Sequence, residues 1–322
     1  MLSLSPKDFR YSTPSHSRSR YPVSAVMLAT LIFVGLRANW ASGATGDIKI
    51  EGRALGSTIS IGTSARFAGS VTSLIFRGKQ FVDTRDHGRE WQSASSFDGF
   101  GECFNPTEAG SRMDGDKETT SSKLLATKSG PNWLATSTDM AFWLPPGFDY
   151  GHQCGMSPTA THAVNTTLTG RHILDKRIQI GDEGQPNVIS DHVTYTVPEA
   201  HGSGTFEAAT VYTPIDFSKR YVLNLASTNV EPTTAIGEQD QPVILATADG
   251  NYAIGLYSPF LPQRPKLGYG SFTFPNTNKI NCVFREKPIA AGQKFNYVCD
   301  IVVGSLAEVK ASILQLNSHH AH

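Results

Sequence analysis

Apolar and polar residues alternate along most of this chain, in short runs that are separated by glycine, proline and asparagine. The runs IKIEG, STISIG and SVTSLIFRGKQFV show this alternation near the start, and residues 165–257 continue it with many β-branched and aromatic side chains. A period of two is typical of strands that bury one face. The pattern therefore predicts an all-β chain with about fifteen or more strands.

A helical period appears near the end of the chain. Residues 305–316 place Leu306, Val309, Ile313 and Leu316 at helical spacing, which predicts a short amphipathic closing helix. The number of strands exceeds the seven to nine of an immunoglobulin-like sandwich. We therefore predict a large antiparallel sandwich of two sheets with a short C-terminal helix.

The first 44 residues follow a different pattern. Arg18 and Arg20 precede an apolar run from Pro22 to Leu36, and the small residues Ser-Gly-Ala end the segment at position 44. Basic, apolar and small residues in this order indicate a secretory signal, although an uncleaved anchor is the alternative. The apolar run is short for a membrane span, so we expect no stable span after cleavage. The expected organisation is a signal peptide and leader (residues 1–44), a single sandwich domain (residues 45–318) and a disordered tail (residues 319–322), with the protein secreted or periplasmic.

Composition and charge narrow the classes of function. The 322 residues are 39% hydrophobic and 17% charged, which is ordinary for a globular protein. Residues 1–44 hold five basic residues and one acidic residue, so the remainder keeps 23 of the 28 basic and 27 of the 28 acidic residues. The resulting charge of −4 gives no electrostatic reason to expect a nucleic acid as a partner.

Export would change how the four cysteines are interpreted. An oxidising compartment favours disulfides, and the sequence alone cannot choose among the three possible pairings. Cys282 and Cys299 flank an apparent hairpin, which favours a bridge between them, and Cys103 with Cys154 would form the other. Because the chain has no CxxC spacing, we expect no zinc site, and we expect neither another metal nor a cofactor.

Residues 83–111, DTRDHGREWQSASSFDGFGECFNPTEAGS, show neither a helical nor a strand period. They predict a long, ordered, irregular segment, and such segments are usually functional. Aromatic rings beside carboxylates, amides and an arginine suit a sugar, which has an apolar face and a rim of hydroxyls. The alternative is a structural loop with buried salt bridges. We predict that the segment binds substrate, with Arg89 orienting it, Trp91 stacking on it and further contacts from Gln92, Asp98, Asn105 and Glu108.

A second irregular run, residues 147–162, contains Tyr150 and His152. A bridge between Cys103 and Cys154 would join it to the first segment and would bring His152 near Glu102. Proton transfer on a sugar needs a general acid and a general base, which a histidine and a carboxylate can provide. We predict that both segments line one cleft that binds a saccharide, with Glu102 and His152 as the acid–base pair and Tyr150 as a substrate contact.

Three other residues are weaker candidates for acid–base catalysis. His87 lies within the first irregular segment, and His192 lies in a strand whose alternation could turn it toward a concave sheet surface. A lone histidine in a strand is more often structural. Glu286 stands between Arg285 and Lys287, and an exposed ion pair is an equally good interpretation.

Two stretches of the chain resemble the galactose mutarotase-like supersandwich group, which contains aldose epimerases and domains of glycoside hydrolases and polysaccharide lyases. The run GSVTSLIFRGK (residues 69–79) is similar to the opening of that group, and Glu286 before Pro288 and AGQKFNY is similar to its ending, where a catalytic glutamate precedes a turn and the final strand. The mutarotase signature N-H-x-Y-F-N-L is absent. The resemblance therefore implies a sugar-handling supersandwich more than mutarotase chemistry.

Two classes of function follow from these patterns. The first is an exported carbohydrate-active enzyme of the epimerase, glycoside hydrolase or polysaccharide lyase type. The second is a non-catalytic sandwich that binds glycans. Both classes would have a saccharide or polysaccharide as partner, and the sequence leaves the oligomeric state open. A structural or assembly protein is a third class. The many acidic residues and aromatic rings of the irregular segments disfavour it.

Overall fold

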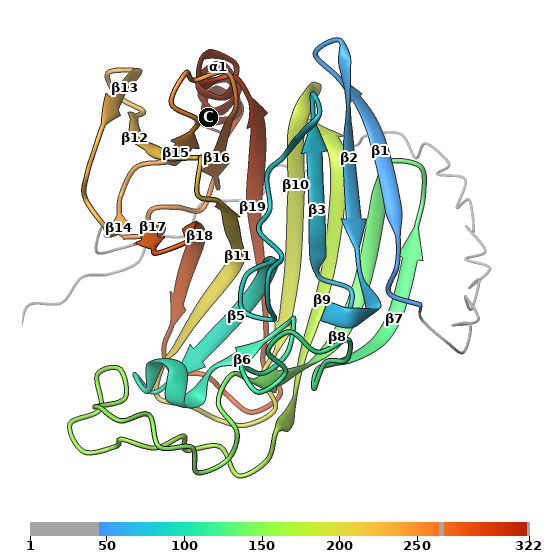
Figure 1. Cartoon of the computed structure of the whole chain (residues 1–322). Coiled ribbons are helices and arrows are strands. Elements are labelled where there is room, and N and C mark those ends of the chain that lie inside the picture. Colours follow the sequence, from blue (N-terminus) through green and yellow to red (C-terminus); the bar gives the residue numbers. More distant parts are fainter. Residues whose placement is uncertain (1–44, 264–266, 321–322) are drawn as a thin grey trace, which may run out of the picture. The chain divides into compact units, whose positions relative to one another are not determined.

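The computed structural model describes residues 45–263 and 267–320, so the segment expected to be a signal peptide lies outside the described residues. The described part contains nineteen strands and one α-helix, and all strand pairs are antiparallel (Figure 1). The predicted all-β fold with a closing helix is therefore confirmed. No helix among the described residues is long and apolar enough to cross a membrane.

The strands form two layers, which we call layer A and layer B. Layer A has the order β13 (Asn229–Pro232), β12 (Lys219–Asn224), β15 (Val243–Ala246), β16 (Ala253–Tyr257), β19 (Lys294–Gly304), β10 (Gln185–Thr196), β9 (Thr169–Asp182), β8 (Trp133–Phe142) and β7 (Lys123–Ser129). Layer B has the order β1 (Lys49–Ala54), β2 (Ser57–Thr63), β3 (Val71–Phe76), β5 (Trp91–Phe97), β11 (Gly204–Pro214), β18 (Thr277–Glu286), β17 (Tyr269–Phe274) and β14 (Gly237–Gln239), with β4 (Lys79–Gln80) beside β3. The short β6 (Pro106–Thr107) pairs with both β5 and β8 and thereby joins the layers.

The core follows directly from the alternation along the strands. On β9, Leu174 and Ile178 are fully buried and belong to the main core cluster together with Phe206 of β11 and Phe284 of β18. Successive strand residues point to opposite faces, so these positions face the space between the layers. The residues between them on β11 and β18 therefore lie on the outer face of layer B, where the cavity described below is found.

The helix α1 (Leu306–His320) covers part of the outer face of layer A. Its residues Val309, Ile313 and Leu316 pack with Ile244 and Val302 in a second apolar cluster. The helix is longer than the sequence indicated: it includes His319 and His320, where the tail was expected to begin. His320 Nε2 lies 2.8 Å from Glu183 Oε1, a contact that supports the last helical turn.

Residues 83–111 are less irregular than predicted. They contain β5, which pairs with β11, and the 3-10 helix η2 (Gly101–Phe104). The alternation is hidden because the outward side chains of β5 are buried as well. Gln92 faces the polar cavity while Trp91 faces the core, so burial on both faces removes the usual contrast between exposed polar and buried apolar positions.

Candidate functional site

A polar cavity with two adjoining compartments lies on the outer face of layer B. The inner compartment, of about 150 Å³, lies over β5, β11 and β18, and the outer compartment has a volume of about 430 Å³. Four residues line both compartments, which makes them parts of one cavity: Gly88, Glu102, Trp143 and Tyr212. The cavity thus joins the first irregular segment to regular strands of the sandwich.

A β-bulge in β11 builds the floor of the inner compartment. Strict alternation would place Glu207 on the opposite face from Thr210 and Tyr212. The register of β11 shifts between Glu207 and Ala209 against β18, so one extra residue is inserted. This insertion turns Glu207 to the same face as Thr210 and Tyr212, and all three line the cavity.

The floor carries an ion pair between neighbouring strands. Lys279 Nζ of β18 lies 2.8 Å from Glu207 Oε2, and Thr210 Oγ1 donates a hydrogen bond of 2.5 Å to the same oxygen. Burial disfavours both charges, but Lys279 and its neighbours hold the pKa of Glu207 below its usual value, and Glu207 raises the pKa of Lys279. Both groups therefore stay charged at neutral pH, while burial raises the pKa of Tyr212 and keeps its phenol protonated.

Glu102 stands at the rim, on η2, and is the exposed carboxylate of both compartments. Burial, together with a side-chain hydrogen bond to Glu102, raises the pKa of Tyr150 to about 12. The ring of Tyr150 contacts that of His152 at a centroid distance of 4.0 Å. Tyr150 therefore contacts both Glu102 and His152, but His152 is exposed and does not line the cavity.

The disulfide between Cys103 and Cys154 fastens η2 to the second irregular segment, with a Cα–Cα distance of 5.7 Å. The backbones approach closely here, because a Cβ atom on Gly155 would lie 2.4 Å from the Gly99 carbonyl oxygen. The second disulfide joins Cys282 of β18 to Cys299 of β19 across the core. The structure thus contains both of the bridges that export would favour, and the first one fixes the element that carries Glu102.

Three of the predicted substrate contacts line the cavity. Arg89 lies in the outer compartment and forms ion pairs with Asp86 (3.3 Å) and Asp83 (3.7 Å). Gln92 and Asn105 line the inner compartment. The Oε1 atom of Gln92 accepts a hydrogen bond of 3.1 Å from the Ala109 backbone, which fixes the direction of its amide.

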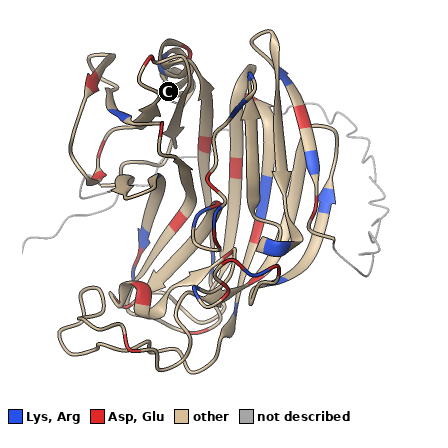
Figure 2. Cartoon of the chain, in the orientation of Figure 1, with Lys and Arg blue, Asp and Glu red and all other residues tan. Residues whose placement is uncertain are grey.

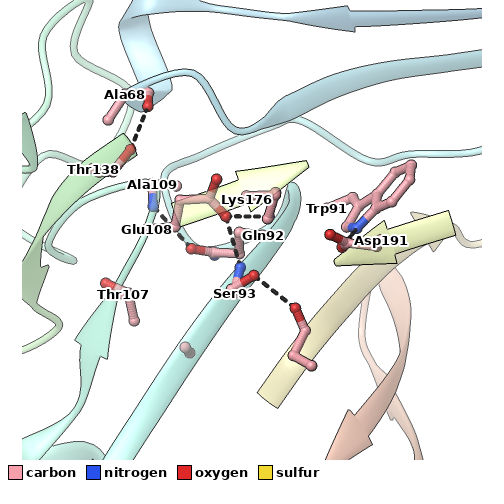
Figure 3. Close-up of polar contacts among 12 residues, drawn as sticks. Ala68, Trp91, Gln92, Ser93, Thr107, Glu108, Ala109, Thr138, Lys176 and Asp191 are labelled. Atoms are coloured by element: carbon pink, nitrogen blue, oxygen red, sulfur yellow. Dashed lines mark hydrogen bonds and ion pairs between the residues drawn. The ribbon is translucent and has the colours of Figure 1, made fainter. Parts of the chain in front are cut away.

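Trp91 and Glu108 are fully buried between the layers, and Figure 3 shows their polar contacts. Trp91 Nε1 donates a hydrogen bond of 2.9 Å to Asp191, and burial raises the pKa of this aspartate to about 7. Glu108 pairs with Lys176 and accepts a hydrogen bond from the Ser93 backbone. Neither Trp91 nor Glu108 lines a compartment. Instead of the predicted contact with substrate, both residues make contacts that support β5, which borders the inner compartment.

The three weaker catalytic candidates also have structural surroundings. His87 lines the outer compartment, but both of its ring nitrogens face backbone carbonyl oxygens, those of Gly115 (2.7 Å) and Arg66 (2.9 Å). His192 is exposed on β10, in the other layer from the cavity. Glu286 is seven residues after Lys279 on β18 and therefore points to the opposite face, where it accepts a hydrogen bond from Tyr297.

Several residues that line the cavity were not predicted from the sequence, among them Trp143, Glu207, Thr210, Tyr212 and Lys279. Four of these five lie on regular strands, which the sequence marks only as sandwich elements. One signal was available in β11, where the apolar residues Phe206 and Ala208 continue as Ala209 and Val211, one position out of phase. Such a phase shift indicates a bulge and a change in which side chains share a face.

A chain of histidines and carboxylates links the end of β5 to the β10–β11 connection. Glu199 Oε1 contacts His172 Nε2 (3.0 Å) and His201 Nε2 (3.2 Å), and His201 Nδ1 contacts Asp98 Oδ2 at 2.7 Å. The ring of His201 stacks on Phe97 at 4.3 Å. Asp98, a predicted substrate contact, is therefore occupied by this chain and lines neither compartment of the cavity.

The cluster makes the stability of the fold depend on pH. Burial by itself lowers the pKa of His201 and raises those of Glu199 and Asp98, but the contacts among them outweigh it: the pKa of His201 is raised, that of Asp98 lowered, and that of Glu199 lowered to about 2. The contribution of His201 to the free energy of unfolding is fully present below pH 6.5, and it is lost as pH rises through the raised pKa of His201. The carboxylate contributions are present above pH 4.5 and are lost as pH falls through the lowered values.

We therefore expect the stabilisation by this cluster to be largest between pH 4.5 and 6.5. Replacing His201 with glutamine should lower the melting temperature by a few degrees at pH 5.5, and this difference should shrink steadily toward pH 9. Thermal unfolding of both proteins across this range measures the effect. A difference that stays constant with pH would show that His201 acts through packing on Phe97 rather than through its charge.

No known protein family and no curated protein matches the sequence. Among solved structures, an α-mannosidase from Enterococcus faecalis V583 is similar with 10% identity and a TM-score of 0.50, over 88% of this chain and 32% of the mannosidase. A putative aldose 1-epimerase from Escherichia coli K12 matches with 7% identity and a TM-score of 0.43, over 81% of this chain and 100% of the epimerase. A heparan sulfate lyase mutant from Pedobacter heparinus matches with 9% identity and a TM-score of 0.42, over 81% of this chain and 35% of the lyase. The mannosidase match is a likeness of fold, and it is consistent with the two-layered sandwich described above.

Proposed function

We propose that this protein is an exported carbohydrate-active protein that binds a saccharide in the two-compartment cavity. The observation that carries the proposal is the cavity floor, where Lys279, Glu207 and Thr210 present fixed hydrogen-bonding groups in a compartment that Trp143 and Tyr212 also line. A sugar offers hydroxyls that match such groups and an apolar face that matches aromatic rings.

The proposal includes acid–base chemistry with Glu102 as the proton acceptor. Glu102 is exposed at the rim, while Lys279 and Tyr212 hold protons at neutral pH because their pKa values are raised. Glycoside hydrolysis by two carboxylates needs one of them protonated. The lowered pKa of Glu207 does not suit the role of the protonated carboxyl group.

A non-catalytic glycan-binding sandwich is the second candidate. The specific observation in its favour is that Lys279 and Tyr212 are weak proton donors at neutral pH, because general acids work best with a pKa near the working pH. In that case the same cavity would hold the saccharide without converting it.

Two substitutions separate binding from turnover. Replacing Lys279 with methionine removes a charged hydrogen-bond donor from the floor, and we expect saccharide affinity to fall roughly tenfold or more. Replacing Glu102 with glutamine should preserve affinity within about threefold and reduce turnover by roughly 100-fold or more if Glu102 is the base. Calorimetric binding and product analysis by NMR across a panel of glycans provide the two measurements.

Glu286→Gln is the control, since Glu286 faces away from the cavity and should leave both quantities unchanged. Retained binding without turnover in the unaltered protein would select the non-catalytic candidate. Binding that survives Lys279→Met unchanged would place the saccharide site elsewhere.

A further inference from the structure

The outer compartment differs from the inner one in its lining. Trp143 lines both compartments, and Phe274 and Pro275 line the outer one alone. Phe274 is 42% exposed, although it is a large aromatic side chain at the end of β17. Exposed aromatic faces at the mouth of a polar cavity are suited to stacking on the apolar faces of sugar rings.

The two volumes suggest a division of roles. The inner compartment, at about 150 Å³, is below the range of roughly 300–1,000 Å³ that is typical of pockets for drug-sized ligands, and the outer one, at about 430 Å³, is within it. The inner compartment therefore suits a single sugar ring, held by the floor. The outer compartment has room for further rings that continue from the first past Trp143 and toward Phe274.

The cations of the cavity are almost all neutralised by carboxylates. Lys279 pairs with Glu207 and also lies in the field of Glu102, and Arg89 pairs with Asp86. Arg112 is the exception among the described residues, since its guanidinium has no carboxylate partner there and lies 5.0 Å from the Phe148 ring centre. It is exposed to solvent at the outer compartment. Over the strands as a whole, basic and acidic residues are interspersed (Figure 2).

We infer that the ligand of this cavity is an oligosaccharide of at least two units, with a neutral ring on the Lys279–Glu207 floor and the next ring along Trp143 and Phe274. The inference rests on the proposed saccharide function and specifies its substrate class. A uronic acid in the inner compartment would bring its carboxylate near Glu207 and Glu102 without a free cation to neutralise it. Elimination on a uronate needs such a cation, so the same argument disfavours lyase chemistry.

Binding of neutral and uronic-acid saccharides of one to four units to the full mature protein tests both parts. We expect a neutral disaccharide to bind roughly three- to tenfold tighter than its monosaccharide, because an additional ring contacts an aromatic face. Phe274→Ala should remove the gain from the outer units and leave monosaccharide affinity unchanged. Phe260→Ala, which removes an exposed phenylalanine that lines neither compartment, should change neither.

A separate variant tests whether the charges of the cavity floor disfavour a uronic acid. Glu207→Gln keeps the shape of the side chain and the acceptor for Thr210 but leaves Lys279 without its closest carboxylate. We expect the ratio of uronate affinity to neutral affinity to rise roughly tenfold in this variant. Lys294→Met, at an exposed position of β19 that lines neither compartment, should leave the ratio unchanged.

The outcomes separate this inference from the proposed function. Equal affinity for monosaccharides and oligosaccharides would overturn the oligosaccharide inference, and tighter binding of uronates by the unaltered protein would overturn the neutral class; the proposed saccharide function would survive either result. Absence of binding by every member of the panel would overturn both.

Discussion

Replacing Lys176 with methionine is expected to lower the free energy of unfolding by about 3–5 kcal/mol. Lys176 and Glu108 form an ion pair in the interior, with side chains that are 1% and 0% exposed (Figure 3). The substitution leaves the Glu108 carboxylate buried without its cation, and its Oε1 atom already has no hydrogen-bond partner among the described residues. An uncompensated buried charge is far more costly than a lost surface interaction.

Urea denaturation of the unaltered protein and the variant gives the change in unfolding free energy. Lys294→Met, at an exposed position of β19, is the matched control and should change it by no more than about 0.5 kcal/mol. Adding Glu108→Gln to Lys176→Met should recover part of the loss, because the remaining buried charge is removed. A loss for Lys176→Met as small as that of the control would show that the pair contributes little.

The sequence was sufficient for the architecture because the alternation survives wherever a strand has one buried face. It also marked the helical spacing of Leu306 to Leu316 correctly. It failed at β5, where Gln92 is buried against the polar cavity and the buried serines around it make the strand look like a loop. The feature that made residues 83–111 appear irregular is therefore the same feature that makes them part of the site.

The candidate site has a loop half, which the sequence predicted, and a strand half, which it did not. The physical reason differs between the two. The loop half, with Arg89, Glu102 and Asn105, stands out because polar residues there interrupt the strand pattern. The strand half, with Glu207 and Lys279, does not, since polar residues are expected on the outer face of a sandwich. Only pairing between distant strands brings these two residues to 2.8 Å, and no local pattern contains that information.

Removing each disulfide in turn is expected to have similar effects on stability but different effects on binding. The bridges span sequence separations of 51 and 17 residues, and the chain-entropy model assigns them about 4 and about 3 kcal/mol. The Cys103–Cys154 bridge holds η2, which carries Glu102, against the segment that carries Tyr150. The Cys282–Cys299 bridge lies in the core, on the opposite face of β18 from Lys279.

We therefore expect the double alanine variant at Cys103 and Cys154 to bind saccharide roughly three- to tenfold more weakly, because the ordering of Glu102 and Tyr150 must then occur on binding. The double alanine variant at Cys282 and Cys299 should bind with unchanged affinity, provided that both variants are measured at a temperature where circular dichroism shows them folded. Calorimetric titration with one glycan gives both affinities. Equal losses of affinity in the two variants would attribute the effect to general destabilisation. Unchanged affinity in both would mean that η2 keeps its position without the bridge. The stacking of Phe104 on Phe142 at 4.9 Å and the close backbone contact at Gly155 would then hold it.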